Sequence, residues 1–277
     1  MSKCLIINKV ILTSVFIVCA TYPLYAGNEN YPAGARSAAL SNASVALTDV
    51  WSTFNNQAGL SWLPSPVVSV YFENRFQVKE FSMRAAAFAF PVKPGCIAVS
   101  YRSFGYSVFN ESKFGLTYSL KISKHFSAAA QVDYLQSYFG NGYGDYHTVA
   151  GEVGIMAEPL TNLWIGFHVF NPTQTKKDAI EEEKIPTVVR LGICYRVGEK
   201  AGLMFETEKD ISQKPVFKGG VEVGVIENLN FRAGYRSGYE QYSLGMGYKF
   251  KGVIADLAFS RHQILGFSPQ VSLGYEF

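Results

Sequence analysis

The sequence predicts an all-β fold: a transmembrane antiparallel β-barrel of about 14 strands with a short N-terminal plug that contains small helices. One reason is that segments of about ten residues alternate between apolar and polar side chains. A second is that short and long connections alternate between these segments. A third is composition: aromatic residues make up 15% and charged residues only 17% of the chain, whereas soluble domains carry about 25% charged residues.

The N-terminus has the pattern of a signal peptide. Lys3 and Lys9 precede an apolar run at residues 10–20, and the small residue Ala26 offers a cleavage site before Gly27. Such a run is too short to span a membrane as a helix. Residues 1–26 are therefore predicted to direct export. No later segment holds 18 consecutive apolar residues, so strands are the expected spanning elements.

Residues 27–65 do not alternate as strands do. Residues 35–47 are rich in Ala and Ser, and residues 49–63 carry two Trp and Gly59. Short helices and turns are expected here. Such a segment can fold into the lumen or hang outside it, and its small residues favour a plug packed inside a narrow barrel.

Residues 66–277 are predicted to form the barrel. The clearest strand is 189–197, where Val189, Leu191 and Ile193 alternate with Arg190 and Gly192. The candidate strands are 67–76, 80–90, 95–104, 112–121, 125–136, 147–157, 162–170, 187–197, 200–208, 216–226, 229–237, 241–250, 252–261 and 268–277.

The last strand carries an expected assembly signal. Tyr275 and Phe277 lie on its apolar face, and the chain stops on the aromatic residue. Outer-membrane barrels finish in this way, with the apolar face toward lipid. We therefore expect contact with outer-membrane lipid and recognition of this strand by the barrel-assembly machinery.

The connections indicate an orientation. Those from even to odd strands are brief, as at residues 92–95 and 123–124, whereas most of those from odd to even strands are longer, as at 137–146 and 171–186. Short turns face the periplasm in outer-membrane barrels. The predicted location is the bacterial outer membrane, with both termini in the periplasm.

Many charges fall on the inward frame of the predicted strands. The inferred lumen charges include Arg190, Arg196, Glu206, Glu222, Arg232 and Arg236; the other members are Arg84, Arg102, Lys113, Lys121, Lys218, Lys249, Asp133, Glu152, Asp256 and Glu276. Confined charges must be paired or wet. They could brace the barrel and plug as an ion-pair network, or line a polar conduit with a mild preference for anions.

The sequence does not predict an enzyme. Its four His are scattered, without the spacing of a metal site, and no nucleophile-elbow motif is present. We expect no catalytic, cofactor or metal site. The net charge of +3 is too small to indicate nucleic-acid binding. Cys96 and Cys194 are expected to be free, buried thiols.

Several motifs resemble those of the FadL-type (OMPP1/FadL/TodX) outer-membrane proteins, and more closely their PorV/PorQ branch in Bacteroidota. The plug carries Gly34-Ala35-Arg36, then Asp49, then Asn56-Gln57-Ala58-Gly59-Leu60. Gln57 stands where that family usually has Pro, and Ser41-Asn42 where a Gly pair is common. In the barrel, residues 185–192 and 229–235 are also similar to that branch.

The resemblance implies a 14-stranded plugged barrel and two possible functions. PorV/PorQ relatives serve type IX secretion, which implies a non-enzymatic scaffold that binds other envelope or secreted proteins. FadL-type members pass hydrophobic compounds, which implies a passive channel for small hydrophobic or amphipathic solutes. The modest loops and heavily charged lumen favour the scaffold, with the channel as the alternative.

Overall fold

The computed structural model describes residues 30–140, 144–175, 185–198, 200–238 and 240–277. The predicted signal peptide, residues 1–26, lies outside the described residues. No helix among the described residues is long and apolar enough to cross a membrane.

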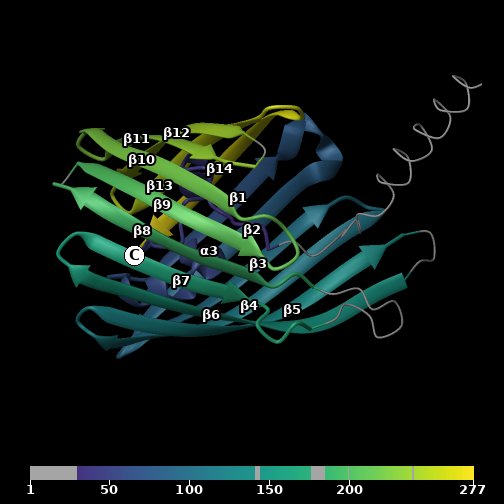
Figure 1. Cartoon of the computed structure of the whole chain (residues 1–277), viewed down its shortest axis with the longest axis horizontal. Helices are drawn as coiled ribbons and strands as arrows, with labels where there is room; N and C mark the ends of the chain where they lie inside the picture. The colour runs from purple at the N-terminus through teal and green to yellow at the C-terminus, as the bar shows by residue number, and fades with distance from the viewer. Residues whose placement is uncertain (1–29, 141–143, 176–184, 199, 239) are drawn as a thin grey trace, which may run out of the picture.

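Fourteen strands form a closed antiparallel barrel in which each strand pairs with its neighbours in sequence, and β1 pairs with β14 (Figure 1). The predicted strand number and topology are confirmed. The strands are β1 (Val67–Asn74), β2 (Ser82–Val92), β3 (Gly95–Gly105), β4 (Phe109–Ser123), β5 (Phe126–Phe139), β6 (Gly144–Leu160), β7 (Leu163–Phe170), β8 (Val188–Val197), β9 (Ala201–Asp210), β10 (Val216–Ile226), β11 (Leu229–Arg236), β12 (Gln241–Phe250), β13 (Val253–His262) and β14 (Gly266–Glu276).

Three neighbouring strands are longer than their sequence pattern predicts. β4, β5 and β6 have 15, 14 and 17 residues, and their pairing continues through segments that were expected to be loops. Rings on the inner face hold this extension together, with centroids 5.3 Å apart for Phe109 and Phe139 and 5.8 Å for Phe139 and Tyr146. Conversely, residues 75–81 leave the strand pattern and form the short 3-10 helices η2 (Arg75–Gln77) and η3 (Lys79–Phe81).

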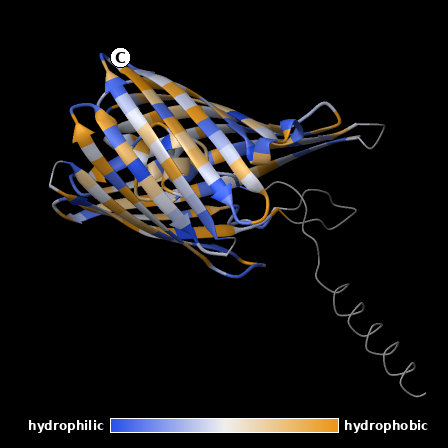
Figure 2. Cartoon of the chain, turned by 90° about the horizontal axis from the view of Figure 1, so that it is seen from above, coloured by the Kyte–Doolittle hydropathy of each residue, from blue (hydrophilic) through white to orange (hydrophobic). Residues whose placement is uncertain are grey.

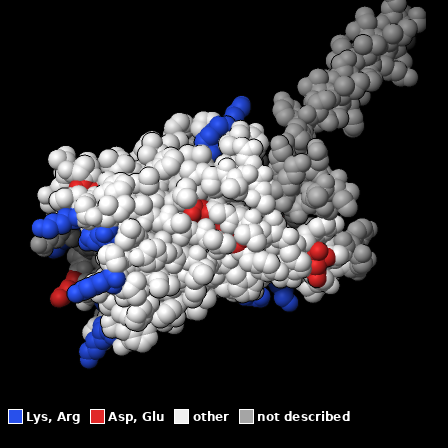
Figure 3. Space-filling view, turned by 90° about the horizontal axis from the view of Figure 1, so that it is seen from below, with Lys and Arg blue, Asp and Glu red and all other residues white. Residues whose placement is uncertain are grey.

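The two faces of the wall differ in polarity. Along β1, Val68, Val70 and Phe72 are exposed on the outside, whereas Ser69 and Tyr71 are buried inside. The same alternation gives each strand of Figure 2 its bands of orange and blue. On the face drawn in Figure 3, Lys and Arg gather mostly toward one end and most of the wall is uncharged. This outer surface suits contact with lipid.

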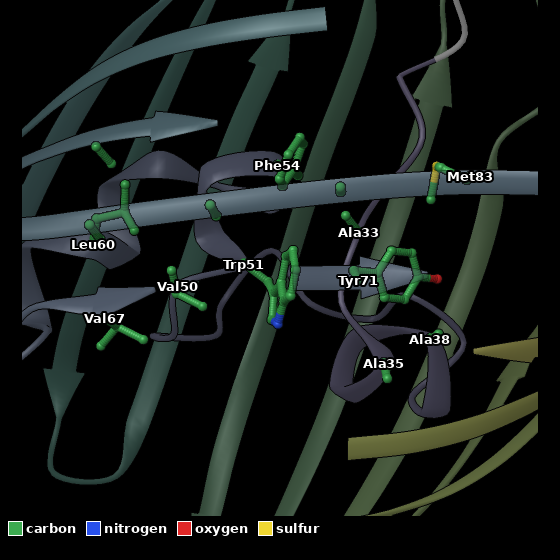
Figure 4. Close-up of a cluster of buried hydrophobic side chains, with 14 of the residues drawn as sticks. Ala33, Ala35, Ala38, Val50, Trp51, Phe54, Leu60, Val67, Tyr71 and Met83 are labelled. Atoms are coloured by element: carbon green, nitrogen blue, oxygen red, sulfur yellow. The ribbon is translucent and has the colours of Figure 1, made fainter. Parts of the chain in front are cut away.

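Residues 30–65 fill the lumen. They contain the helices α2 (Ala35–Ala39) and α3 (Ser52–Asn55) and the 3-10 helix η1 (Gln57–Trp62). α2 packs against β12 and β13, and η1 packs against β4 and β5. In Figure 4, Trp51 of this segment lies beside Tyr71 of the wall, in a buried cluster that also includes Phe54, Leu60 and Met83. We call residues 30–65 the plug.

Inward-facing glycines let the plug backbone approach the wall. A Cβ built on Gly234 would lie 2.3 Å from the carbonyl carbon of Leu40, and one on Gly166 would lie 2.1 Å from the carbonyl oxygen of Val45. Gly245 and Gly220 leave similar room for Ala39 and Leu40. The plug is therefore seated where the wall has no side chains, and no other residue type fits there without displacement.

The barrel has a turn end, where the brief connections lie, and a loop end. The first strand begins and the last strand finishes at the turn end, where the Phe277 N–H donates to the Pro66 carbonyl oxygen at 3.0 Å. The plug, however, begins near the loop end, because Asn30 shares a cavity with Asp210 and Val216 of the β9–β10 connection. Because the strand number is even, the start of β1 and the end of β14 must lie at the same end of the barrel. The strand number does not determine where the plug begins.

Gly234→Val should displace the plug, because its first side-chain carbon overlaps the Leu40 backbone. The expected result is rapid tryptic cleavage after Arg36 in detergent-solubilised protein, measured by mass spectrometry. Gly219→Val, on the outer face of β10 with no atom closer than 4.0 Å to its Cβ, is the matched control and should leave Arg36 protected. Equal protection of both variants would contradict this account of the plug seat.

Candidate functional site

A cavity of about 470 Å³ opens above the plug at the loop end. Its walls carry Glu73 and Arg75 from the β1 side and Arg190, Glu208 and Arg236 from the opposite side. The entry of the plug, with Tyr31, also lines it. This loop-end cavity combines charged groups of both signs with aromatic surface, a combination that can hold a small amphipathic molecule.

A second cavity, of about 420 Å³, lies on the other side of the plug at the turn end. Trp51 of the plug and Arg196, Lys249 and Glu276 of the wall line it. Lys249 and Glu276 form an ion pair near the rim. The two cavities have no lining residue in common, and the plug lies between them.

An ion-pair ladder joins the plug to the wall. Arg36 of the plug donates from Nε and Nη2 to the two oxygens of Glu222, at 2.9 and 2.7 Å, and from Nη1 to Asp49 at 3.1 Å. Glu222 also accepts from Arg232 at 2.6 Å, and Arg232 reaches Asp256 at 2.6 Å. Two cations and three carboxylates thus alternate in one chain of ion pairs across the plug–wall boundary. We call this group the latch.

Glu206 of β9 holds the plug through its backbone. One carboxylate oxygen accepts from the N–H groups of Ser44 and Val45, both at 2.8 Å. The other accepts from Lys218 at 2.8 Å. Glu206 is only 1% exposed, so these charge-assisted bonds form away from water, where losing them is costly.

Glu208 gathers three cations beside the loop-end cavity. Its oxygens lie 2.7 Å from Lys218, 2.9 Å from Arg190 and 3.3 Å from Arg236. The sequence analysis missed Glu208, because the predicted strand stopped at this residue. Continuing the inward alternation from Glu206 by two positions would have found it.

A second buried cluster lies where β4, β5, β6 and β7 face the plug. Glu152 accepts from His168 at 2.7 Å and from Gln57 of the plug at 2.6 Å, and it pairs with Lys113. Lys113 also lies 3.3 Å from Asp133. Gln57, which departs from the Pro of the FadL-type motif, thus gives the plug a hydrogen bond that Pro could not make. The role of His168 was also missed, since nothing in the sequence links it to Glu152.

Cations also hold the entry of the plug. Arg190 donates to the Asn30 carbonyl oxygen at 3.0 Å, and Arg102 donates to that of Tyr31 at 2.9 Å. The Arg75 guanidinium lies 3.9 Å from the centre of the Tyr31 ring. Arg102 and Arg190, two of the inferred lumen charges, therefore bind the plug itself.

The other residues of the plug motif have structural roles. Gly34 has a φ of 102°, and a Cβ there would lie 2.4 Å from the Trp51 ring. Ala35 is buried in α2. Asn56 donates to the carbonyl oxygens of Val45 and Ile155 at 2.7 and 3.1 Å. A Cβ on Gly59 would lie 2.5 Å from the Leu47 carbonyl oxygen.

One predicted lumen charge is wrong: Arg84 lies on the outer face. It pairs in register with the outward Phe72, whereas Met83 and Ala85 are the buried residues of that strand. Arg196 and Lys121 are on the inner frame but exposed near the turn end. At that end, Tyr275 and Phe277 lie on the outer face with ring centroids 5.0 Å apart, and Phe277 is 68% exposed.

The lumen offers no evident chemistry of a reactive site. Among the described residues no group of His, Cys, Asp or Glu could hold a metal ion. Cys96 and Cys194 are buried and free.

Comparison with solved structures finds proteins of similar fold. The CymD monoaromatic hydrocarbon channel has a TM-score of 0.70 at 10% identity over 91% of this chain and 99% of that chain. The Pseudomonas aeruginosa FadL homologue has 0.66 at 12% identity over 91% and 100%. The P. putida toluene transporter TodX has 0.66 at 11% identity over 91% and 99%.

The chain has the fold of the FadL/TodX-type channels. No family model and no curated protein matches the sequence. The likeness therefore rests on structure, and the nearer resemblance to the PorV/PorQ branch remains a sequence-based hypothesis.

Glu206→Ala should destabilise the folded protein by about 3 kcal/mol or more, because it leaves two buried backbone donors without their charged acceptor. The measurement is the urea midpoint of the shift between folded and unfolded mobility on unheated gels. Glu276→Ala, which breaks an ion pair beside an exposed lysine at the rim, should cost less than about 1 kcal/mol. Similar midpoints for the two variants would show that Glu206 does not anchor the plug.

Proposed function

We propose that this protein is a plugged channel of the bacterial outer membrane that lets a small hydrophobic or amphipathic solute cross passively. The apolar outer wall supports the membrane location. The fold shared with CymD and TodX, two proteins described as a hydrocarbon channel and a toluene transporter, supports transport over the scaffold that the sequence analysis favoured.

One observation carries the proposal: the lumen holds a cavity at each end, and a noncovalent plug separates them. The plug is covalently continuous with β1. Otherwise it is held by ion pairs, hydrogen bonds and packing, and both described cysteines are free. A shift of the latch would join the cavities into one path. A barrel that served only as a surface would have no need for cavities on both sides of its plug.

The size and lining of the cavities limit the solute. Volumes of about 470 and 420 Å³ fall in the range of small-molecule sites, roughly 300–1,000 Å³, and are too small for a folded protein. Aromatic rings such as Tyr71 and Phe76 lie beside arginines in the loop-end cavity. A compact solute with an apolar body and a polar group fits this lining best.

A scaffold remains the second candidate because of apolar side chains at the loop end. Ile264 and Leu265, in the connection between β13 and β14, are 84% and 53% exposed, and Val78 and Phe81 in the neighbouring connection are 37% and 44% exposed. Exposed apolar groups beyond the barrel wall suit a protein partner. In the scaffold hypothesis this partner would be another envelope or secreted protein.

Weakening the latch should open the channel. Wild-type protein in planar bilayers should conduct little, and Glu222→Ala should raise conductance and speed the entry of a fluorescent apolar dye into vesicles severalfold, since Arg36 loses its bidentate partner. Glu227→Ala, at the exposed β10–β11 turn and outside both cavities, is the control and should behave as wild type. If both wild type and Glu222→Ala match protein-free vesicles, the channel proposal fails and the scaffold is favoured.

Cysteine labelling tests the orientation. We expect Ser212→Cys, in the β9–β10 loop, to react with a membrane-impermeant maleimide on intact cells. Glu227→Cys, at the β10–β11 turn, should react only after the outer membrane is permeabilised. The native cysteines are buried and serve as the unlabelled background. The reverse pattern would place the turn end outside the cell.

A further inference from the structure

Two arginines stand on the outer wall, on adjacent strands whose other outward side chains are mostly apolar. Arg84 is the third residue of β2 and Arg261 is the penultimate residue of β13; both side chains are exposed. On the four adjacent strands β13, β14, β1 and β2, they are the only charged residues on the outward frame. Both lie at the loop end, and the outward residues at the turn end of these strands are apolar or aromatic.

Neither arginine is neutralised by the protein. Among the described residues, no acidic side chain forms an ion pair with Arg84 or Arg261. The contact of Arg261 is with an aromatic ring, its guanidinium carbon lying 5.6 Å from the centre of Phe267. A lipid-facing arginine costs roughly 2–4 kcal/mol at the bilayer midplane and little near an interface. These two therefore belong at headgroup level, where phosphates are available.

The register gives the two arginines a common setting. Arg261 pairs with Phe267 on β14, and Arg84 pairs with Phe72 on β1, so two outward aromatic rings lie between them. Three strand spacings of roughly 4.8 Å separate their strands, about 14 Å across the sheet. Phe72 pairs with Val271, so along the strands the level of Arg84 is four residues from that of Arg261, and the two arginines are roughly 19 Å apart over the sheet. Toward the turn end from Arg84 lie the exposed apolar side chains of Val70 and Leu273.

We propose that this sector is a binding site for a glycolipid whose headgroup carries two phosphates, one for each arginine. Guanidinium groups bind phosphate with two parallel hydrogen bonds. The sugar of such a headgroup packs against Phe72 and Phe267, and its acyl chains lie along the apolar strip below. The site is on the outside of the wall and does not depend on what passes through the lumen.

A lipid fits this sector better than an acidic protein does. The arginines lie within the strands, below the loop connections, and the surface beneath them is the one that faces acyl chains. A protein partner would have to enter the bilayer to reach them. A membrane lipid already has its phosphates at this level and its apolar chains alongside.

The test compares Arg84→Gln/Arg261→Gln with Lys209→Gln in purified full-length protein. Lys209 is also outward at the loop end, but its ammonium group is bound to the Gln213 carbonyl oxygen, and it lies on a different sector. The probes are a bisphosphorylated glucosamine-disaccharide lipid and its dephosphorylated form, added to detergent-solubilised protein. Bound lipid is counted by native mass spectrometry, and unheated gel mobility shows that each variant is folded.

We expect wild type and Lys209→Gln to bind the bisphosphorylated lipid and to discriminate against the dephosphorylated form at least tenfold. The double Gln variant should lose that discrimination, and Arg84→Lys/Arg261→Lys should keep part of it. Undiminished binding by the double Gln variant, or equal binding of both lipids by wild type, would overturn the site. Displacement of the lipid by millimolar inorganic phosphate would also overturn it, because it would make the site one for free anions.

Discussion

The carboxylate of Glu222 lies between an arginine of the plug and an arginine of the wall, and the organisation of the lumen depends on that bridge. Arg36 and Arg232 could not face each other across a confined lumen without the charge between them. Asp49 and Asp256 pair with the two arginines at the ends of the chain. Because the bridge fixes where the plug stops, it also fixes the position of the boundary between the two cavities.

Ion pairs alone would hold the plug loosely. The close fit comes from wall positions that lack side chains. Inward positions at Gly166, Gly220, Gly234 and Gly245 lack side chains where the plug backbone passes. Next to this seat, Glu206 accepts two backbone N–H groups of the plug, which have no partner in a helix or strand. The same plug segment, residues 39–45, thus has its backbone N–H groups hydrogen-bonded and its backbone packed closely against the wall. This explains how a plug with little regular structure can be held firmly.

The strand number, the barrel topology and the inward frame of most charges could be predicted from the sequence, because a half-buried strand must alternate. The prediction failed for Arg84, since residues 85–87 are three consecutive alanines and leave the frame of β2 ambiguous. It also made β4–β6 too short at the loop end, because aromatic pairs between strands order that region. The partners of Glu152, His168 and Glu208 come from different strands, so no local pattern could reveal them. The inward glycines could have been recognised, but their role is evident only from the position of the plug in the folded protein.

A heavily charged lumen first argued for a scaffold, since a hydrophobic solute gains little from facing ions. The structure weakens that argument. Most of these charges form ion pairs with one another or hydrogen bonds to the plug backbone, as do Glu206, Glu208 and Arg190. A paired charge presents a much smaller field than an isolated one, so the cavities are less polar than the sequence suggests. The aromatic side chains of Tyr31, Tyr71 and Trp51 form part of the cavity walls beside them. The same ions that argued for a scaffold in the sequence are therefore, in the folded protein, the groups that hold the plug in the barrel.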